Sequence, residues 1–392
     1  MPTESTQVAI VGAGPAGLVL SHLLEEAGIH SILLDTRTRD QIEETIRAGI
    51  LEQGTVDLLK RIDPDTRVDS VGQRHDGIVL GFDGEEHRVD LSSLTGRSVW
   101  LYPQHEVLKD MLALRLRRGQ DIRFGVTATE VSGVETGRPT VHAKHSTGED
   151  VVVEADIVVG ADGSRSVVRS VVAGATGNYF REYPFAWFGI LCDAPPSSQE
   201  LIYSNSPRGF ALISQRNKNV QRMYFQCDPA VDTADLHESE IWDTLQARVP
   251  NTTLQRGPII QRDLLRFRSF VARRLCWGRA VLVGDAAHTV PPTGAKGMNL
   301  AVADVVILAD ALRALFSEDD ERLLDSYAET ALRRIWKAQH FSWWMTSMLH
   351  EHDGASAFDR ARQLGELRSV VESQAGLTYL AEGYTGWPLA GA

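Results

Sequence analysis

The amino-acid sequence predicts an α/β fold with three parts: a Rossmann-like nucleotide-binding domain, an inserted domain with a mostly antiparallel β-sheet, and a helical C-terminal region. Three observations support this prediction. A glycine-rich turn at residues 12–17 follows an apolar run at 8–11 and opens a helical stretch that reaches about residue 28. Alternating apolar and polar runs fill residues 180–275, and long helical patterns follow at about 299–316 and 321–349.

The glycine-rich turn has the spacing of a dinucleotide-binding fingerprint. Gly12 allows the tight turn, Gly14 lets the backbone approach a pyrophosphate, and Gly17 permits close packing of helix on strand. The helix that follows offers free N–H groups and a positive dipole end. Asp35 ends the next apolar run, where a carboxylate binds ribose hydroxyls and disfavours a 2′-phosphate. This site is therefore predicted to bind FAD or NAD rather than NADP.

Two further aspartates follow apolar runs. Asp162 follows the run at 157–159, and Asp285 follows the run at 280–283. Ligands of open α/β sheets bind where parallel strands end. Either aspartate could instead be a turn or N-cap residue. Because the pattern recurs at two strand ends and follows a dinucleotide fingerprint, the three motifs together predict an FAD site.

Composition limits the classes of function. A chain of 392 residues can form one large or two interlocked domains, and a formal net charge of -12 argues against nucleic acid. Three cysteines lie far apart without CxxC spacing, which predicts neither a disulfide framework nor a metal site and favours the cytoplasm. The N-terminus has no signal-peptide pattern. The longest apolar stretch, 301–315, carries charged residues, so no membrane span is expected.

The changes of pattern predict a discontinuous FAD-binding domain at 1–72, 98–175 and 276–349. A substrate-binding β domain is expected at 73–97 and 176–275, with a C-terminal segment at 350–392 closing the active site. The sequence contains no second GxGxxG. A nicotinamide cofactor would therefore have to dock without a Rossmann unit of its own.

With these motifs the chain resembles the aromatic-ring hydroxylase family of single-component flavoprotein monooxygenases. The resemblance is greatest to members that act on 4-hydroxybenzoate, and it spans essentially the whole chain. It rests on segments 46–49, 51–54, 207–210, 214–216, 290–297, 334–338 and 341–345. It implies a homodimeric enzyme that converts 4-hydroxybenzoate to 3,4-dihydroxybenzoate with FAD, O2 and NADH or NADPH, through a flavin hydroperoxide.

The resemblance assigns the substrate contacts. Arg216 is expected to bind the substrate carboxylate, since a planar guanidinium offers two parallel charge-assisted bonds. Ser214 and Tyr224 would add hydroxyl bonds to the same group. Tyr203 would contact the phenol and Tyr384 would relay its proton, because a neutral O–H both accepts and donates.

Further positions match the family by the same resemblance. His75 would end the proton relay at the solvent, and the Pro292 carbonyl would face the reacting ring. Backbone N–H groups at the start of the following helix would meet the reduced flavin. The remaining FAD contacts expected by family position are Arg47, Gln104, Asp162, Arg222, Asp285, Gly297, Met298 and Asn299.

The nicotinamide site departs from the NADPH-specific pattern. Gln41 and Thr45 stand where NADPH-specific relatives carry a tyrosine and an arginine, and Glu43 would repel a 2′-phosphate. We therefore expect NADH to be accepted; whether it is preferred over NADPH stays open. By family position, Arg165 and Arg268 would contact this cofactor.

Three alternatives stay open. The first is a hydroxylase of another aromatic acid, against which the joint presence of Tyr203, Arg216 and Tyr384 argues. The second is a flavin oxidase or dehydrogenase, which incorporation of labelled oxygen would distinguish. The third is a non-catalytic flavin-binding sensor, for which the sequence shows no appended partner domain.

Overall fold

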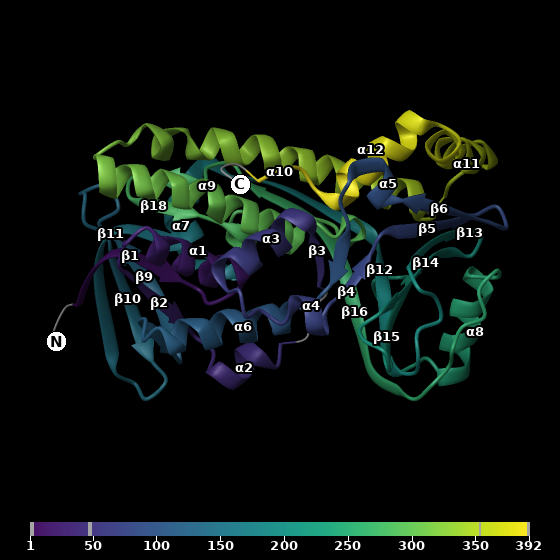
Figure 1. The fold of residues 1–392 in the computed structure, drawn as a ribbon, viewed down its shortest axis with the longest axis horizontal. Coiled ribbons are helices and arrows are strands. Elements are labelled where there is room, and N and C mark those ends of the chain that lie inside the picture. Colours follow the sequence, from purple (N-terminus) through teal and green to yellow (C-terminus); the bar gives the residue numbers. More distant parts are fainter. Residues whose placement is uncertain (1–3, 46–48, 353, 390–392) are drawn as a thin grey trace.

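A mostly parallel sheet forms the centre of the nucleotide-binding half (Figure 1). The computed structural model describes residues 4–45, 49–352 and 354–389. In spatial order the strands are β17 (Cys276–Trp277), β18 (Ala280–Leu282), β11 (Asp150–Gly160), β1 (Glu4–Val11), β2 (Ser31–Asp35) and β8 (Ile122–Phe124), with β10 (Thr140–His145) and β9 (Val126–Ser132) extending from β11.

The parallel strands form because their residues are apolar on both faces. The last four residues of β1 are all buried, and β1 pairs in parallel with β2 and β11, so their carboxyl ends share one edge. α1 (Pro15–Glu26) and α7 (Val167–Ala173) pack against this sheet, α6 (Gln104–Arg117) packs against α1, and α2 (Arg39–Glu43) packs against α6. This half also contains α3 (Gln53–Ile62) and α4 (Val68–Val71). A small sheet of β3 (Ile50–Glu52), β7 (Val99–Leu101) and β4 (Gln73–His75) lies beside them.

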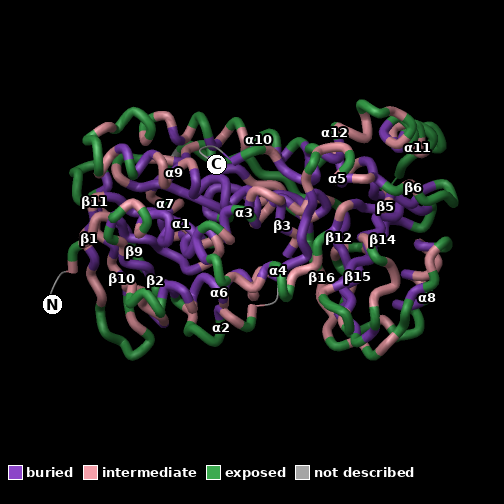
Figure 2. Tube along the Cα trace, in the orientation of Figure 1, coloured by how far each residue is buried: buried purple, intermediate pink, exposed green. Residues whose placement is uncertain are grey.

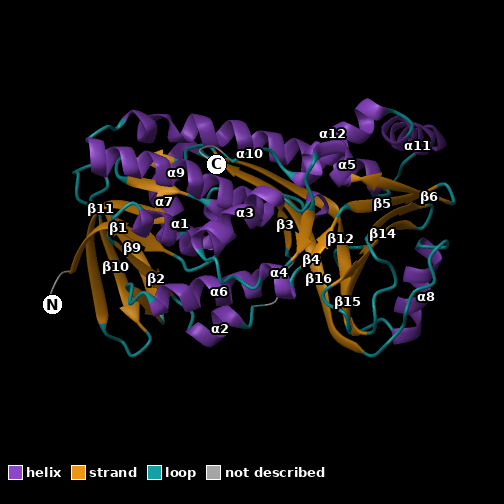
Figure 3. Ribbon diagram, in the orientation of Figure 1, coloured by secondary structure: helices purple, strands orange, loops and turns teal. Residues whose placement is uncertain are grey.

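The second large sheet is mostly antiparallel, as the alternating sequence pattern predicted. Its order is β19 (His288–Thr289), β16 (Ile259–Ala272), β12 (Asn178–Asp193), β15 (Val220–Cys227), β14 (Gly209–Gln215), β13 (Leu201–Ser206), β5 (Gly77–Phe82) and β6 (Glu85–Asp90). Only the β13–β5 pair is parallel among its described pairs. Figure 3 shows α8 (Glu238–Arg248) at the far end of this sheet.

Two long helices connect the halves. They are α9 (Gly297–Glu318) and α10 (Arg322–Leu349), at the positions of the helices predicted at about 299–316 and 321–349. Both lie along one side of the molecule (Figure 1). The N-terminal part of α10 is tied to the nucleotide-binding sheet by the Tyr327 hydroxyl, which donates to Leu282 O. Its C-terminal end reaches the second sheet, where α11 (Ala357–Val371) and α12 (Gln374–Thr385) follow. The short α5 (Leu91–Thr95) packs against α12.

Three buried clusters correspond to this arrangement (Figure 2). The first fills the nucleotide-binding half, the second lies between the second sheet and the C-terminal helices, and the third lies on the opposite face of that sheet under α8. No helix among the described residues is long and apolar enough to cross a membrane.

Candidate active site

The glycine-rich turn is closed so tightly that side chains do not fit in it. Gly12 has φ +107°, and a Cβ there would lie 2.3 Å from Ala161 O. A Cβ at Gly17 would lie 1.9 Å from Gly12 O. The end of β1 thus lies beside the end of β11, and the first turn of α1 packs closely on the glycine-rich turn.

Two long helices present open N-termini, which fit the charge of FAD. Neither α1 nor α9 has a side-chain cap or an acidic residue in its first turn, although both are described in full. At Gly14 a Cβ would approach only Ala161 O, at 4.0 Å, and at Gly297 it would meet nothing within 4 Å. Uncapped N–H groups beside open space suit a pyrophosphate at one helix and an anionic flavin ring at the other.

Asp35 lies at the end of β2, as predicted, but its carboxylate is already engaged. Its Oδ2 accepts from Ala13 N at 2.7 Å, which ties the acid to the glycine-rich turn. Arg37 binds both oxygens through its guanidinium at 2.9 Å, and its backbone N–H donates to Oδ1 at 2.8 Å. A ribose hydroxyl would therefore meet a carboxylate whose charge Arg37 partly neutralises.

The two later aspartates differ in their surroundings. Asp162 Oδ2 accepts from Val167 N at 2.7 Å, at the first residue of α7, whose N-cap is Ser166. Asp162 thus stabilises the start of this helix without being its N-cap. Its Oδ1 is buried without a hydrogen-bond partner among the described residues, and burial raises the pKa of this carboxyl. Asp285 is exposed beside Gly284, whose φ is +60°. Asp285 is thus the more open of the two.

The loop before α9 is fixed by a buried ion pair. Lys296 Nζ donates to Glu52 Oε1 at 2.6 Å and to Tyr384 O at 3.1 Å, and both charged side chains are less than a tenth exposed. Asn299 accepts from Glu52 N through its side chain and donates to Ala295 O. These bonds fix β3, the loop and the end of α12 to one another.

Pro292 begins a short 3-10 turn (Pro292–Gly294), and its carbonyl accepts from Ala295 N at 2.9 Å. Behind this turn, Thr293 is fully buried and its hydroxyl contacts that of Thr346 on α10 at 2.9 Å. The predicted position of Pro292 against a reacting ring stays a prediction. Met298 is half-buried in the first turn of α9.

The two tyrosines predicted as a phenol pair lie together. Tyr203 OH and Tyr384 OH are 2.7 Å apart, and each side chain is 1% exposed. Burial is the main reason why the pKa of both phenols is raised. Tyr203 on β13 and Tyr384 on α12, 181 positions apart in the sequence, thus form one neutral, hydrogen-bonded pair.

His75 does not lie at the surface, where the relay prediction placed it. Its side chain is 3% exposed, and its Nε2 contacts Gln215 Nε2 at 3.1 Å rather than either tyrosine. Burial lowers the pKa of His75, while Glu200 and Asp76 oppose that shift. A relay from Tyr384 to His75 therefore stays a prediction.

Three of the expected substrate contacts, Tyr203, Ser214 and Tyr224, share one face of the second sheet. Strand register places Tyr203, Leu212, Tyr224 and Asp263 in one row, with Gly189 between the last two. A Cβ at Gly189 would lie 2.3 Å from Asp263 Oδ1, so only glycine leaves room for this row. Tyr203 stands two strand spacings from Tyr224, roughly 10 Å.

The adjacent row carries the polar groups. Ser214 lies opposite Arg222 and its hydroxyl donates to Arg222 O at 2.7 Å. Arg222 donates through Nε to Tyr224 OH at 2.9 Å and forms an ion pair with Asp263. Arg216 follows Ser214 at the end of β14, where burial lowers its pKa while Tyr224 opposes the shift. The structure therefore gathers two hydroxyl groups and two guanidinium groups at one end of the tyrosine row.

The other predicted contacts lie at the edge of this region. Arg165 ends the turn after Asp162, Arg268 lies on β16, and both are exposed. Gln104 is the first residue of α6 and is half-buried. Arg47 lies outside the described residues.

Sequence reasoning missed several residues that build the site. Arg169 donates to Ala286 O at 3.0 Å beside Asp285, and Asp304 accepts from Gly284 N at 2.9 Å and contacts His288 Nε2 at 2.5 Å. Glu52 also escaped notice, because its partner Lys296 is 244 positions away. No local sequence pattern predicts contacts between residues so far apart in the chain.

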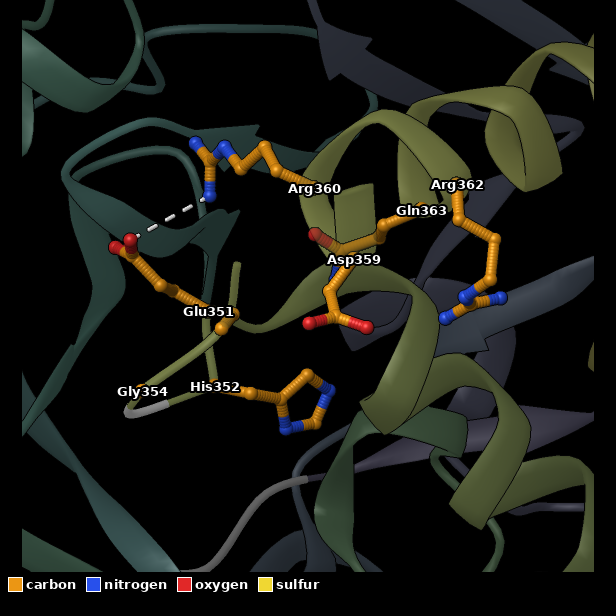
Figure 4. Close-up of a pocket in the computed structure, with 8 residues that line it drawn as sticks. Glu351, His352, Gly354, Asp359, Arg360, Arg362 and Gln363 are labelled. Carbon is orange, nitrogen blue, oxygen red and sulfur yellow. Dashed lines mark ion pairs between the residues drawn. The ribbon is translucent and has the colours of Figure 1, made fainter. Parts of the chain in front are cut away.

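A cavity of about 290 Å³ lies elsewhere, at the turn between α10 and α11 (Figure 4). Figure 4 shows the Arg360 guanidinium directed towards Glu351, and His352 and Asp359 also line the space. None of the predicted site residues is in its lining. This mixed-charge cavity is therefore separate from the candidate active site.

Comparisons with known proteins agree with this geometry. A family model described as an FAD binding domain matches residues 5–342. The p-hydroxybenzoate hydroxylase of Acinetobacter baylyi is 40% identical over 99% of this chain and 97% of its own. A probable NADH-specific resorcinol 4-hydroxylase of Rhodococcus jostii is 26% identical over 83% of this chain and 62% of its own.

The fold is also that of solved hydroxylases. The crystal structure of p-nitrophenol 4-monooxygenase from Pseudomonas putida DLL-E4 superposes with a TM-score of 0.83 over 98% of this chain and 99% of that one, at 20% identity. The aklavinone-11 hydroxylase solved with FAD and aklavinone superposes with a TM-score of 0.73 over 89% of this chain and 70% of its own, at 22% identity. By the family match over residues 5–342 and the 40% identity to a relative over 99% of this chain, the protein is an FAD-binding enzyme of the flavin-dependent aromatic monooxygenase family.

Proposed function

We propose that this monooxygenase hydroxylates 4-hydroxybenzoate to 3,4-dihydroxybenzoate, with O2 and a reduced nicotinamide nucleotide as co-substrates. The observation that carries the proposal is the row from Tyr203 to Tyr224 on one sheet face, with the Tyr203–Tyr384 pair at one end and the Arg222 cluster at the other. The 40% identity to a p-hydroxybenzoate hydroxylase supports the same substrate.

The two ends of the row suit the two ends of this substrate. A carboxylate would bind near Arg216, Ser214 and Tyr224, where guanidinium and hydroxyl groups offer charge-assisted bonds. The phenol would then reach Tyr203, because the roughly 10 Å between the strands matches a ring with a substituent at each end. A 3-hydroxy isomer would leave the buried Tyr203 hydroxyl unpaired by substrate, which disfavours it.

Proton transfer is the task of the tyrosine pair. Because burial raises the pKa of both phenols, Tyr203 and Tyr384 stay neutral and can accept and donate at once. Tyr203 would accept the proton of the substrate phenol and pass its own hydroxyl proton to Tyr384. His75 is the group predicted to release the proton to solvent. When bound, FAD supplies the reduction of O2 and the transfer of one oxygen atom to the ring.

We also propose that NADH is accepted. The Gln41 side chain is used in the capping box of α2, where its Oε1 accepts from Thr38 N at 2.9 Å. Arg39 pairs with Glu43 at 2.5 Å, and Arg37 is paired with Asp35. Each arginine of this segment thus lies beside a carboxylate, whose negative charge would repel a 2′-phosphate. Matched kcat/KM values for NADH and NADPH test this, and a strong NADPH preference would overturn it.

Substrate binding is tested by a conservative substitution. Arg216→Lys keeps the charge but loses the planar fork, so KM for 4-hydroxybenzoate should rise by about ten- to a hundredfold. Arg208→Lys, at an exposed arginine of the same hairpin, is the matched control and should leave KM unchanged. Equal KM values in the parent and Arg216→Lys would contradict the assigned carboxylate site.

A further inference from the structure

A second row of the sheet, on the side of the tyrosine row away from Ser214 and Arg222, is hydrogen-bonded to the end of α10. Asn205 Nδ2 donates to Leu349 O at 3.1 Å, and Gln226 Nε2 donates to Glu351 O at 2.7 Å. Between them, Trp187 Nε1 donates to His350 Nε2 at 2.7 Å. Three successive residues at the end of α10 thus each contact a polar side chain of the second sheet.

The tautomer of His350 follows from its two partners. Its Nε2 accepts the Trp187 proton, so Nδ1 carries the hydrogen and donates to Thr346 O at 2.8 Å. The ring is fully buried and stacks on Phe185 and Phe210, with centroids 4.6 and 4.3 Å away. Burial lowers its pKa to about 3, so Nε2 remains an acceptor throughout the physiological range.

Trp187 carries this constraint to the proposed substrate site. Its ring lies 5.0 Å from that of Tyr224 and 5.1 Å from that of Phe210. Register places Trp187 two residues before Gly189 on β12, on the same sheet face. Tyr224 in turn accepts from Arg222. The Trp187 indole ring therefore packs against the Tyr224 ring.

We propose that His350 is a positioning residue for substrate. By accepting the indole N–H of Trp187, it fixes the indole ring that packs against Tyr224, and so it holds Tyr224 in position to bind the substrate carboxylate. This inference rests on the proposed function. The same turn of α10 also contacts the loop before α9 through Thr346 and Thr293. His350 thus ties the substrate end of the sheet to the turn that carries the predicted Pro292 contact.

The test compares two substitutions of His350 in FAD-loaded protein. His350→Phe keeps an aromatic ring for stacking but removes the acceptor, so the buried Trp187 N–H is left unpaired. His350→Gln restores an acceptor near the position of Nε2. Calorimetric titration with 4-hydroxybenzoate should show Kd raised about tenfold in His350→Phe, as for a lost buried hydrogen bond, and within about threefold of the parent in His350→Gln.

A matched control separates positioning from general weakening. Gln226→Met removes a neighbouring clamp without touching the Trp187 bond, so its melting temperature should fall while Kd stays within about threefold of the parent. A second readout is the Trp187 indole N–H signal in a ¹⁵N spectrum, assigned by Trp187→Phe. It should shift on loss of the acceptor in His350→Phe and return towards the parent position in His350→Gln.

Each outcome decides the matter. Unchanged Kd in His350→Phe, or an equal loss in Gln226→Met, overturns the positioning role while the proposed function stands. If His350→Phe does not fold, Trp187→Phe removes the same bond from the other side and should raise Kd about tenfold; an unchanged Kd there overturns the inference. If the parent itself does not bind 4-hydroxybenzoate, the proposed function fails, and the inference fails with it.

Discussion

Removing one partner of the buried pair Lys296–Glu52 should destabilise the enzyme far more than breaking a surface ion pair. The Nζ–Oε1 distance is 2.6 Å, and the side chains are 2% and 8% exposed, so solvent screens them little. Burial lowers the pKa of Lys296, whereas Glu52 opposes that shift. Replacing Lys296 with Met would leave the Glu52 carboxylate buried without its cation, which costs about 3 to 5 kcal/mol.

A double-mutant cycle measures this directly. Lys296→Met, Glu52→Gln and the combined variant are unfolded in urea as apoproteins. Bound FAD would add RT ln(1 + [FAD]/Kd) to the apparent stability, so weaker cofactor binding would be counted as lost stability. Removing both charges should recover most of the loss and bring the double variant within about 2 kcal/mol of the parent. A cost below about 1 kcal/mol for Lys296→Met, or additive single effects, would refute this reasoning.

Three further predictions follow from the same contacts. Burial lowers the pKa of His22 to about 4 and the pKa of His350 to about 3, below the usual 6.5. As pH falls below 6.5, these histidines therefore take up protons in the unfolded state before they do so in the folded state. Each should then lower the free energy of unfolding by about 1.4 kcal/mol per pH unit. Urea midpoints between pH 7 and 5 should fall less steeply in His22→Gln; a parallel slope would count against the assignment. Gly17→Ala should abolish FAD binding, because its Cβ would lie 1.9 Å from Gly12 O, as equilibrium dialysis would show; retained affinity would contradict the close packing. Gly297→Ala should fold with the parent's melting temperature as apoprotein, because its Cβ meets nothing, yet bind FAD more weakly if the flavin lies over α9; equal affinity would place the flavin elsewhere.

The sequence could predict the parts of this enzyme that depend on local geometry. The turn from Gly12 to Gly17 is such a case, because its spacing and the flanking strand and helix are contiguous. The strand-end positions of Asp35 and Asp285 follow from the same apolar runs. These features were predicted because each depends on fewer than about a dozen neighbouring residues.

Pairings between distant segments could not be predicted. Lys296 and Glu52 are 244 positions apart, and Trp187 and His350 are 163 apart, so no periodicity links them. Burial of His75 likewise depends on the pairing of β4 with β7, which cannot be predicted from a strand of only three residues.

The most direct test of the central claim is the mass of the product formed from 4-hydroxybenzoate under ¹⁸O2. The FAD-loaded enzyme is supplied with NADH and, separately, NADPH, and consumption of the nucleotide is followed with and without the aromatic acid. The account predicts strong stimulation by 4-hydroxybenzoate and 3,4-dihydroxybenzoate carrying one labelled oxygen atom. Stimulation that yields only hydrogen peroxide would mean that the true ring is different, and no stimulation would favour an oxidase.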